Sequence, residues 1–201
     1  MIATARIASS APAPSARPLS DRATEIVTVA RRVLETKGAD ALTMRRVGDE
    51  LSIRAPSLYK HFPNKAAIEL VVIEQALAEL GAALRDAVDG RTPTDAVQPL
   101  LDTYRRVARE HPNLYRLSTF GRLRRDELVP GLEDWAGEPF LLVMGDPYLA
   151  QAVWSAAHGM VILELDGRYP PDSDLDRTWR EAADAFRAAL EAREAALKPR
   201  R

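Results

Sequence analysis

The residues with the clearest chemical purpose lie between Leu42 and Lys65, where cations alternate with apolar side chains. Cations carried on short, outward-facing helices suit a polyanion, and the major groove of B-DNA, about 12 Å wide, admits one helix. We therefore expect one short helix to cross a DNA backbone and a second to enter the groove. The apolar positions are Val47, Leu51, Ile53 and Leu58, and the outward cations are Arg45, Arg46, Arg54, Lys60 and Lys65.

Two short helices must position these side chains. Thr43 is a capping residue ahead of the first, over residues 44–51. The second runs over residues 54–62, with Pro56 in its first turn, where a proline is tolerated. Asp49 and Glu50 lie in the same stretch, and they should point away from phosphates if the cations face DNA.

The flanking sequence predicts further helices. Apolar residues from Ile26 to Leu34 follow a helical period, beginning near Ser20 or Asp21 and stopping at Gly38. A long amphipathic helix follows over about residues 64–88. No run alternates with the period of a strand, so the chain is predicted to be all-α. The remaining helices are expected near residues 94–110, 112–121, 124–144, 147–166 and 175–197.

Charge and composition exclude several classes of protein. The chain has 201 residues and no cysteine, and His61, His111 and His158 are too far apart in sequence to suggest a metal site. Residues 1–65 carry eleven Lys or Arg against six Asp or Glu, a net +5, whereas the remainder carries −6. No apolar run approaches the roughly 20 residues of a membrane span, and no signal sequence is evident. We expect a cytoplasmic protein without cofactor, metal or membrane partner.

The chain divides into four predicted regions. Residues 1–19 are rich in Ala, Ser and Pro and are expected to form a disordered arm. A DNA-binding domain is expected over residues 20–65, a helical effector-binding and dimerisation domain over 66–197, and a tail over 198–201.

The segment resembles the TetR family of transcriptional regulators. The family's signature joins a threonine, an apolar and a small residue, a turn, and a Leu-Tyr-x-His-Phe-x-x-Lys sequence. Residues 154–159 and 111–115 are similar to a subgroup with a Trp-His-Gly helix in its C-terminal domain. The resemblance implies an N-terminal three-helix helix-turn-helix domain, double-stranded DNA as partner and a homodimer. The matching residues are Thr43, Val47-Gly48, Leu51-Ser52-Ile53 and Ser57 to Lys65.

Three residues depart from the family pattern. Ser52 stands where the family usually has Gly, so it must adopt a strained left-handed conformation or relax the turn. Arg54 replaces a frequent Ser at the start of the second helix, and Pro56 replaces a frequent Gly. The departures affect the expected base preference and leave the groove-binding role unchanged.

The resemblance and the chemistry together assign roles to nine residues. Thr43 would contact the DNA backbone, as would Tyr59, His61 and Lys65, and Arg45 is a further DNA-binding candidate. Base edges would be met by Arg54, Ala55, Ser57 and Lys60. Taken singly, Tyr59 and Phe62 also fit a helical core, and His61 fits an ordinary surface position.

The C-terminal part suggests two surfaces. An apolar pocket for an unknown, largely apolar small molecule would use aromatic and soft side chains. A dimer face would use small and large apolar residues on two helices. The pocket candidates are Tyr104, Tyr115, Leu117, Phe120, Trp135, Met144, Trp154 and His158, and the dimer candidates are Val153, Ala157, Met160, Val161, Trp179, Ala183, Phe186 and Leu190.

These features favour a ligand-responsive repressor that binds a palindromic operator as a homodimer, with the long helix over 64–88 transmitting the effector signal. Two alternatives remain. A helical adaptor would bind a protein partner through the basic face, independently of salt. A small all-α enzyme would use His158, although no third group completes a triad with Ser155.

Overall fold

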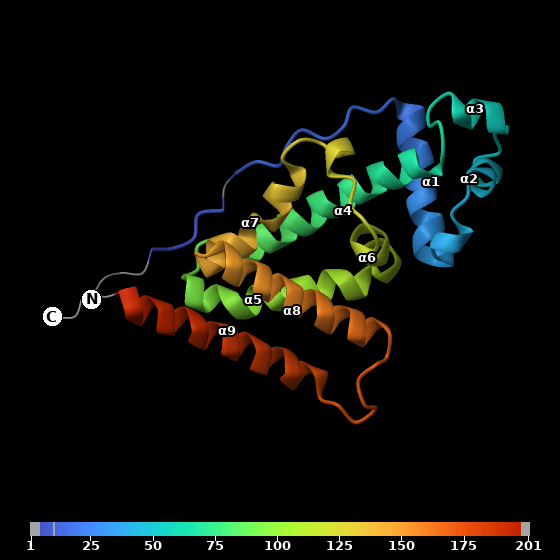
Figure 1. Cartoon of the computed structure of the whole chain (residues 1–201). Coiled ribbons are helices and arrows are strands. Elements are labelled where there is room, and N and C mark those ends of the chain that lie inside the picture. The colour runs from blue at the N-terminus through green and yellow to red at the C-terminus, as the bar shows by residue number, and fades with distance from the viewer. Residues whose placement is uncertain (1–4, 10, 198–201) are drawn as a thin grey trace. The chain divides into compact units, whose positions relative to one another are not determined.

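A computed structural model describes residues 5–9 and 11–197, without the side chains of Ala55, Glu194 and Leu197. Every regular element in this part of the chain is helical, which confirms the all-α prediction (Figure 1). No described helix is long and apolar enough to cross a membrane. The helices are α1 Asp21–Lys37, α2 Met44–Glu50, α3 Ala55–Tyr59, α4 Lys65–Val88, α5 Pro93–Glu110, α6 Pro112–Thr119, α7 Leu132–Met144, α8 Pro147–Leu165 and α9 Leu175–Leu197, with 3-10 turns η1 Ala39–Ala41 and η2 Arg125–Glu127.

The chain packs as two compact units. Of the described residues, the head unit comprises 13–79 and 110–134, and the body unit comprises 5–9, 11–12, 80–109 and 135–197. This division differs from the predicted boundary after Lys65. Part of α4 belongs to each unit, and α6 belongs to the head unit.

Helix α1 organises the core of the head unit. Ser20 caps it by accepting a hydrogen bond from the Ala23 amide, and Gly38 ends it with φ +80°. Its buried face has the predicted apolar stripe, against which α2, α3, α4 and α6 pack. The buried members of this core include Ile26, Val27, Ala30, Val33, Leu34, Leu42, Val47, Leu58, Phe62, Ile68, Val72 and Leu114.

Helix α6 is held to the end of α1 by polar contacts as well as by Leu114. The Asn113 amide donates to the Glu35 carbonyl oxygen at 3.1 Å, and His111 Nδ1 lies 3.5 Å from Glu35 Oε1. Burial raises the pKa of the Glu35 carboxyl, because water is excluded from its charged form. These contacts and the shared core explain why α6 packs with the head unit.

In the body unit an ion-pair network joins α5, α8 and α9. Arg105 Nε donates to Glu164 Oε2 at 2.9 Å, and Arg105 Nη1 donates to Asp176 Oδ1 at 2.6 Å. The Trp179 indole N–H donates to the same Glu164 carboxylate at 3.0 Å. Arg105 and Glu164 are both nearly buried, so each depends on the other for compensation of its charge.

The described N-terminal residues form a strap, which we define as residues 5–9 and 11–20. Ile7 is buried, its amide donates to Arg91 O at 2.8 Å, and its carbonyl oxygen accepts from the Gly90 amide at 2.9 Å. This ordering corrects the predicted disordered arm for the described residues. Backbone and polar hydrogen bonds to residues distant in sequence hold the strap, and amino-acid composition does not predict such bonds. Residues 1–4, 10 and the predicted tail 198–201 lie outside the described residues.

Candidate nucleic-acid interface

The turn between α2 and α3 brings the two short helices together. The Ser52 amide donates to Asp49 O at 3.1 Å, and the Ile53 amide donates to Gly48 O at 3.0 Å. A Cβ atom at Gly48 would lie 3.2 Å from Ile53 O, so the small residue permits this close approach. Ser52 has φ +54°, the left-handed conformation that favours glycine. The turn therefore keeps its geometry, with the strain borne by Ser52.

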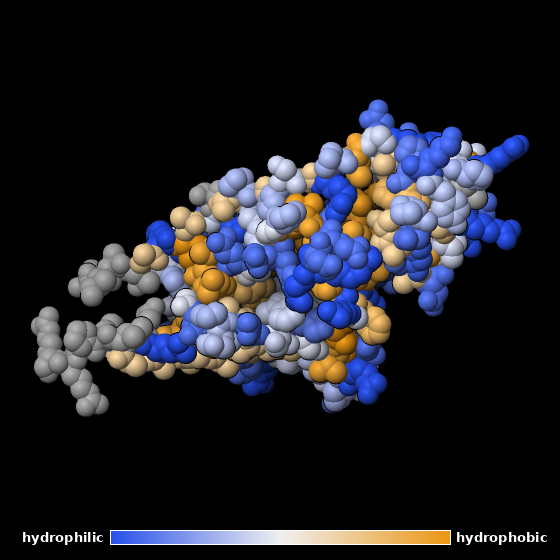
Figure 2. Space-filling view, turned by 45° about the horizontal axis from the view of Figure 1, so that its top comes forward, coloured by the Kyte–Doolittle hydropathy of each residue, from blue (hydrophilic) through white to orange (hydrophobic). Residues whose placement is uncertain are grey.

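Helix α3 and the turn after it expose one set of side chains and bury another. Leu58 is fully buried and Phe62 nearly so, both in the core on α1. Tyr59 is 51% exposed. Hydrophilic side chains project around α2 and α3 at the right of Figure 2. The other exposed candidates here are Arg54, Ser57, Lys60 and His61, whereas the side chain of Ala55 is not described.

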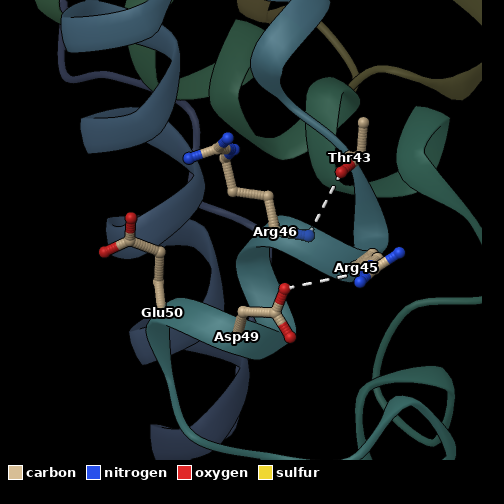
Figure 3. Close-up of a pocket in the computed structure, with 5 residues that line it drawn as sticks. All are labelled: Thr43, Arg45, Arg46, Asp49 and Glu50. Atoms are coloured by element: carbon tan, nitrogen blue, oxygen red, sulfur yellow. Dashed lines mark hydrogen bonds and ion pairs between the residues drawn. The ribbon is translucent and has the colours of Figure 1, made fainter.

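A hollow of about 650 Å³ lies along α2, lined by Thr43, Arg45, Arg46, Asp49 and Glu50. The Thr43 hydroxyl oxygen accepts from the Arg46 amide at 3.1 Å, capping α2, and its own hydrogen stays available to an acceptor. Arg45 and Asp49 point toward each other, while Arg46 and Glu50 lie on the other side of α2 (Figure 3). The helix thus carries a cation on each of two sides.

The two carboxylates of α2 have different partners. Glu50 lies 3.3 Å from both Arg32 and Lys37 of α1, which balance its charge. Asp49 Oδ2 lies 3.8 Å from Arg45 Nε in the hollow. The i, i+4 spacing places Asp49 on the same side of α2 as Arg45, and its orientation relative to phosphates stays a prediction.

Lys65 begins α4 and is already engaged. Its Nζ donates to Ala39 O at 3.2 Å and lies 3.1 Å from Glu69 Oε1. The side chain is about 40% exposed, so a phosphate could reach it by displacing either contact. This tether between η1 and α4 has no signal in the sequence. Arg46, predicted as an outward cation, lines the hollow beside Arg45 and joins the candidate interface.

The eight pocket candidates do not form one group. Tyr115, Leu117 and Phe120 belong to the head unit and the others to the body unit. Phe120 is 90% exposed and Trp154 is 46% exposed, and their part in a ligand pocket stays a prediction. Leu117 packs on the core of the head unit, and Tyr104 meets Phe140 edge to face with ring centroids 5.7 Å apart.

The remaining pocket candidates make contacts of their own in the body unit. Trp135 donates its indole N–H to Ala11 O and lies under the Arg85 guanidinium, while Met144 is buried. Trp154 and His158 stack with ring centroids 6.0 Å apart. Burial lowers the pKa of His158, so its imidazole is neutral at pH 7. No cluster of three or more His, Asp or Glu in the described chain is placed to hold a metal.

The predicted dimer face is largely a core face. The predicted apolar stripe of α8 and α9 packs inside the body unit. Met160 and Phe186 are only half-buried. The assignment is corrected for the six buried candidates, Val153, Ala157, Val161, Trp179, Ala183 and Leu190.

The opposite side of α8 is uncharged and outward-facing. Tyr148 is 79% exposed and Leu163 is 44% exposed, and between them lie Ala152, Ser155 and Gly159. An exposed helix face without charge is unusual for a surface that faces only water.

Two short helices joined by a tight turn, with the second exposing hydroxyl and basic side chains, define a helix-turn-helix DNA-binding protein. Comparisons with known proteins identify the family. Residues 26–70 match the family described as "Bacterial regulatory proteins, tetR family", and residues 97–186 match "Tetracyclin repressor-like, C-terminal domain". The chain belongs to the TetR family of transcriptional regulators.

Similar proteins agree with this assignment. The chain is 28% identical over 187 residues to the HTH-type transcriptional regulator Rv0681 of Mycobacterium tuberculosis, covering 89% of this chain and 85% of the relative. A solved Rhodococcus sp. RHA1 protein of unknown function has a TM-score of 0.73 at 20% identity, covering 85% and 96% of the two chains. A TetR variant of Acinetobacter baumannii AYE, solved in complex with minocycline, has a TM-score of 0.62 at 20% identity, covering 87% and 98%. At this identity the solved structures support the fold. The likeness to a Trp-His-Gly subgroup stays a prediction.

Proposed function

We propose that this regulator is a repressor that binds a palindromic operator as a homodimer and is released by a small-molecule effector. The observation that carries the proposal is the division of α3 and its following turn. Leu58 and Phe62 anchor the segment in the core, which leaves Ser57, Tyr59 and Lys60 free to meet DNA. A helix held in this way enters a groove without losing its own packing.

Each exposed side chain has a role in this proposal. Arg54 and Lys60 meet base edges, where a cation favours the O6 and N7 atoms of guanine. Ser57, exposed in the middle of α3, is a further base-contact candidate, as is Ala55, the first residue of the helix. Thr43, Arg45, Arg46, Tyr59, His61 and Lys65 contact phosphates, which fix the orientation of the protein on the duplex.

Dimerisation would use the uncharged outer face of α8. Tyr148, Ala152, Ser155, Gly159 and Leu163 combine large side chains with small ones, which lets two helices approach closely. A two-fold dimer presents two copies of α3, as a palindrome requires.

The effector would bind in the body unit by recognition and without catalysis. The A. baumannii protein of similar fold was solved with minocycline, a small molecule. In this chain the Trp154–His158 stack offers an aromatic surface beside an imidazole that burial keeps neutral. This chemistry suits a largely apolar ligand with one hydrogen-bonding group.

Selection of bound sequences from a random duplex pool, with and without cell extract, tests the proposal. We expect a two-fold symmetric site with half-sites about 34–36 Å apart, or a multiple of that distance, and weaker binding in extract that contains the effector. The K60A variant should lose the selected site, whereas R168A, which removes an exposed cation of the body unit, should retain it. A selected site without two-fold symmetry, or affinity that is independent of salt, would contradict the proposal.

A further inference from the structure

The strap is fastened to the head unit through a buried carboxylate of α4. Arg17 Nε donates to Glu74 Oε2 at 2.9 Å, and Arg17 Nη2 donates to Glu74 Oε1 at 2.7 Å. The same Nη2 donates to Glu127 O at 2.7 Å, and Glu74 Oε1 also accepts from the Val129 amide at 2.9 Å. Glu74 is only 5% exposed, so its charge depends on the guanidinium.

The other end of the strap is fastened within the body unit. Ser9 donates from its amide to Asp89 Oδ1 at 3.0 Å and from its hydroxyl to Arg85 O at 3.1 Å. Ala11 O accepts from the Trp135 indole at 2.9 Å. With the backbone bonds of Ile7, these contacts give the strap anchors in both units.

Arg17 cannot bind a DNA phosphate while its guanidinium pairs with the Glu74 carboxylate. Its Nε and Nη2 atoms make three donor contacts, and a phosphate that captured the guanidinium would leave a buried carboxylate without a counter-charge. Arg17 therefore has an internal role, although its charge alone would suggest a role in DNA binding.

The position of this contact relates it to the DNA-binding helices. Ser20 caps α1 only three residues after Arg17, so the Glu74 contact restrains the start of α1 on α4. Because α2 and α3 pack on α1, this restraint limits how freely they move. Conformational entropy that is already lost in the free protein does not have to be lost on DNA binding, so the restraint favours affinity.

We propose that the strap is a latch that raises operator affinity by restraining the start of α1, with Arg17 as its positioning residue. This inference rests on the proposed DNA-binding function. It assigns Arg17 and Glu74 a role in affinity without any contact to DNA.

Binding to the selected palindrome tests the latch with the full chain. We expect R17A and E74Q each to bind about 5- to 10-fold more weakly, and the double variant R17A/E74Q to lose no more than either one, because both release the same contact. The double variant also removes the unpaired buried charge, so it tests the latch if R17A folds poorly. The matched control is R22A, which removes an equal charge from an exposed pair with Glu25 and should bind as the unmodified protein does.

The salt dependence of binding separates a latch from a phosphate contact. A latch leaves the salt slope of R17A unchanged, whereas loss of a phosphate contact lowers it by about one unit. A lowered slope, or unchanged affinity in R17A, overturns the proposal.

A measurement without DNA separates the latch from the proposed function. The Val129 amide is bonded to Glu74, so its hydrogen exchange should be about tenfold faster in R17A than in R22A. Equal exchange in the two variants overturns the latch even if DNA binding is as proposed. If the unmodified protein selects no duplex, the proposed function fails together with the latch's role in affinity, while the exchange still reports whether Arg17 holds Glu74.

Discussion

In the helix-turn-helix, one non-glycine residue adopts a backbone conformation that its side chain disfavours. Ser52 lies at φ +54° between two short helices whose packing determines the turn. Hydrogen bonds from the Ser52 and Ile53 amides to α2, together with the burial of Leu58, hold the turn in this conformation. The sequence predicts that Ser52 either adopts a left-handed conformation or relaxes the turn. The structure shows the left-handed conformation.

Replacing Ser52 with glycine should relieve this strain. We expect S52G to raise the free energy of unfolding by about 1 kcal/mol, because glycine adopts the left-handed conformation readily. Urea denaturation followed by circular dichroism measures the change. The control S57G, in helical backbone, should instead lower stability. An equal or lower stability of S52G would show that the turn carries no strain.

Removing Arg54 and removing Lys65 should weaken DNA binding in different ways. R54A should relax the preference at one or two base pairs, since a good bidentate contact to guanine is worth about 1–3 kcal/mol. K65A should weaken binding to all duplexes and lower the salt slope by about one unit. Titration of selected and random duplexes at several salt concentrations distinguishes the two. Equal losses on both duplexes in both variants would contradict the separate roles.

Among the elements, the contact between α4 and α7 depends on a glycine within α4. A Cβ atom at Gly81 would lie 2.5 Å from the Trp135 ring and 2.8 Å from the Ala136 Cα atom. Arg85, one turn later, stacks on the same ring and pairs with Glu138. Gly81 therefore allows the backbone of α7 to lie directly against α4 in the body unit.

A matched pair of glycine substitutions tests this packing. G81A should lower the free energy of unfolding by about 1–3 kcal/mol, because the added methyl meets backbone and ring atoms that cannot both move away. G137A, on an open side of α7, should raise it by about 0.5–1 kcal/mol through helix propensity. Denaturant unfolding of both variants gives the comparison. A similar change in both would mean that the α4–α7 approach is not tight.

Most helices could be predicted from period and caps, and the exceptions have physical causes. Ser20, Gly38 and Thr43 bound α1 and α2 as their types suggest. The predicted helix over 124–144 is interrupted, because η2 and the positive φ of Gly131 precede α7. Pro139 lies inside α7, within the range predicted to be helical. The strap escaped prediction because its partners are about 80 residues away in sequence.

At the scale of the whole molecule, the proposed dimer depends on which side of α8 is free. The dimer face predicted from the sequence contains Val153, Ala157 and Val161 of α8, and the protomer's own core uses these residues. Apolar period alone cannot distinguish a core from an interface, since both bury the same kinds of side chain. The exposed side mixes large and small residues, and its lack of charge is the signal that could have identified it.

A charge placed on this face should separate the protomers. We expect L163R to be monomeric in analytical ultracentrifugation and to lose most of its affinity for the palindrome, because a buried unpaired cation is costly. The matched control is L141R, an identical change at an equally exposed leucine of α7, which should stay dimeric. A dimeric L163R would exclude the outer face of α8 as the interface.

The membership of α6 in the head unit has a consequence for protein engineering. Leu114 and Leu117 fill part of the core on α1, so a hybrid regulator assembled by transplanting residues 20–65 onto a foreign sensor would arrive with an open apolar gap. The module that can be transferred with its core intact is the head unit, residues 13–79 together with 110–134. A fusion must therefore include α6 or redesign the surface of α1 that α6 covers.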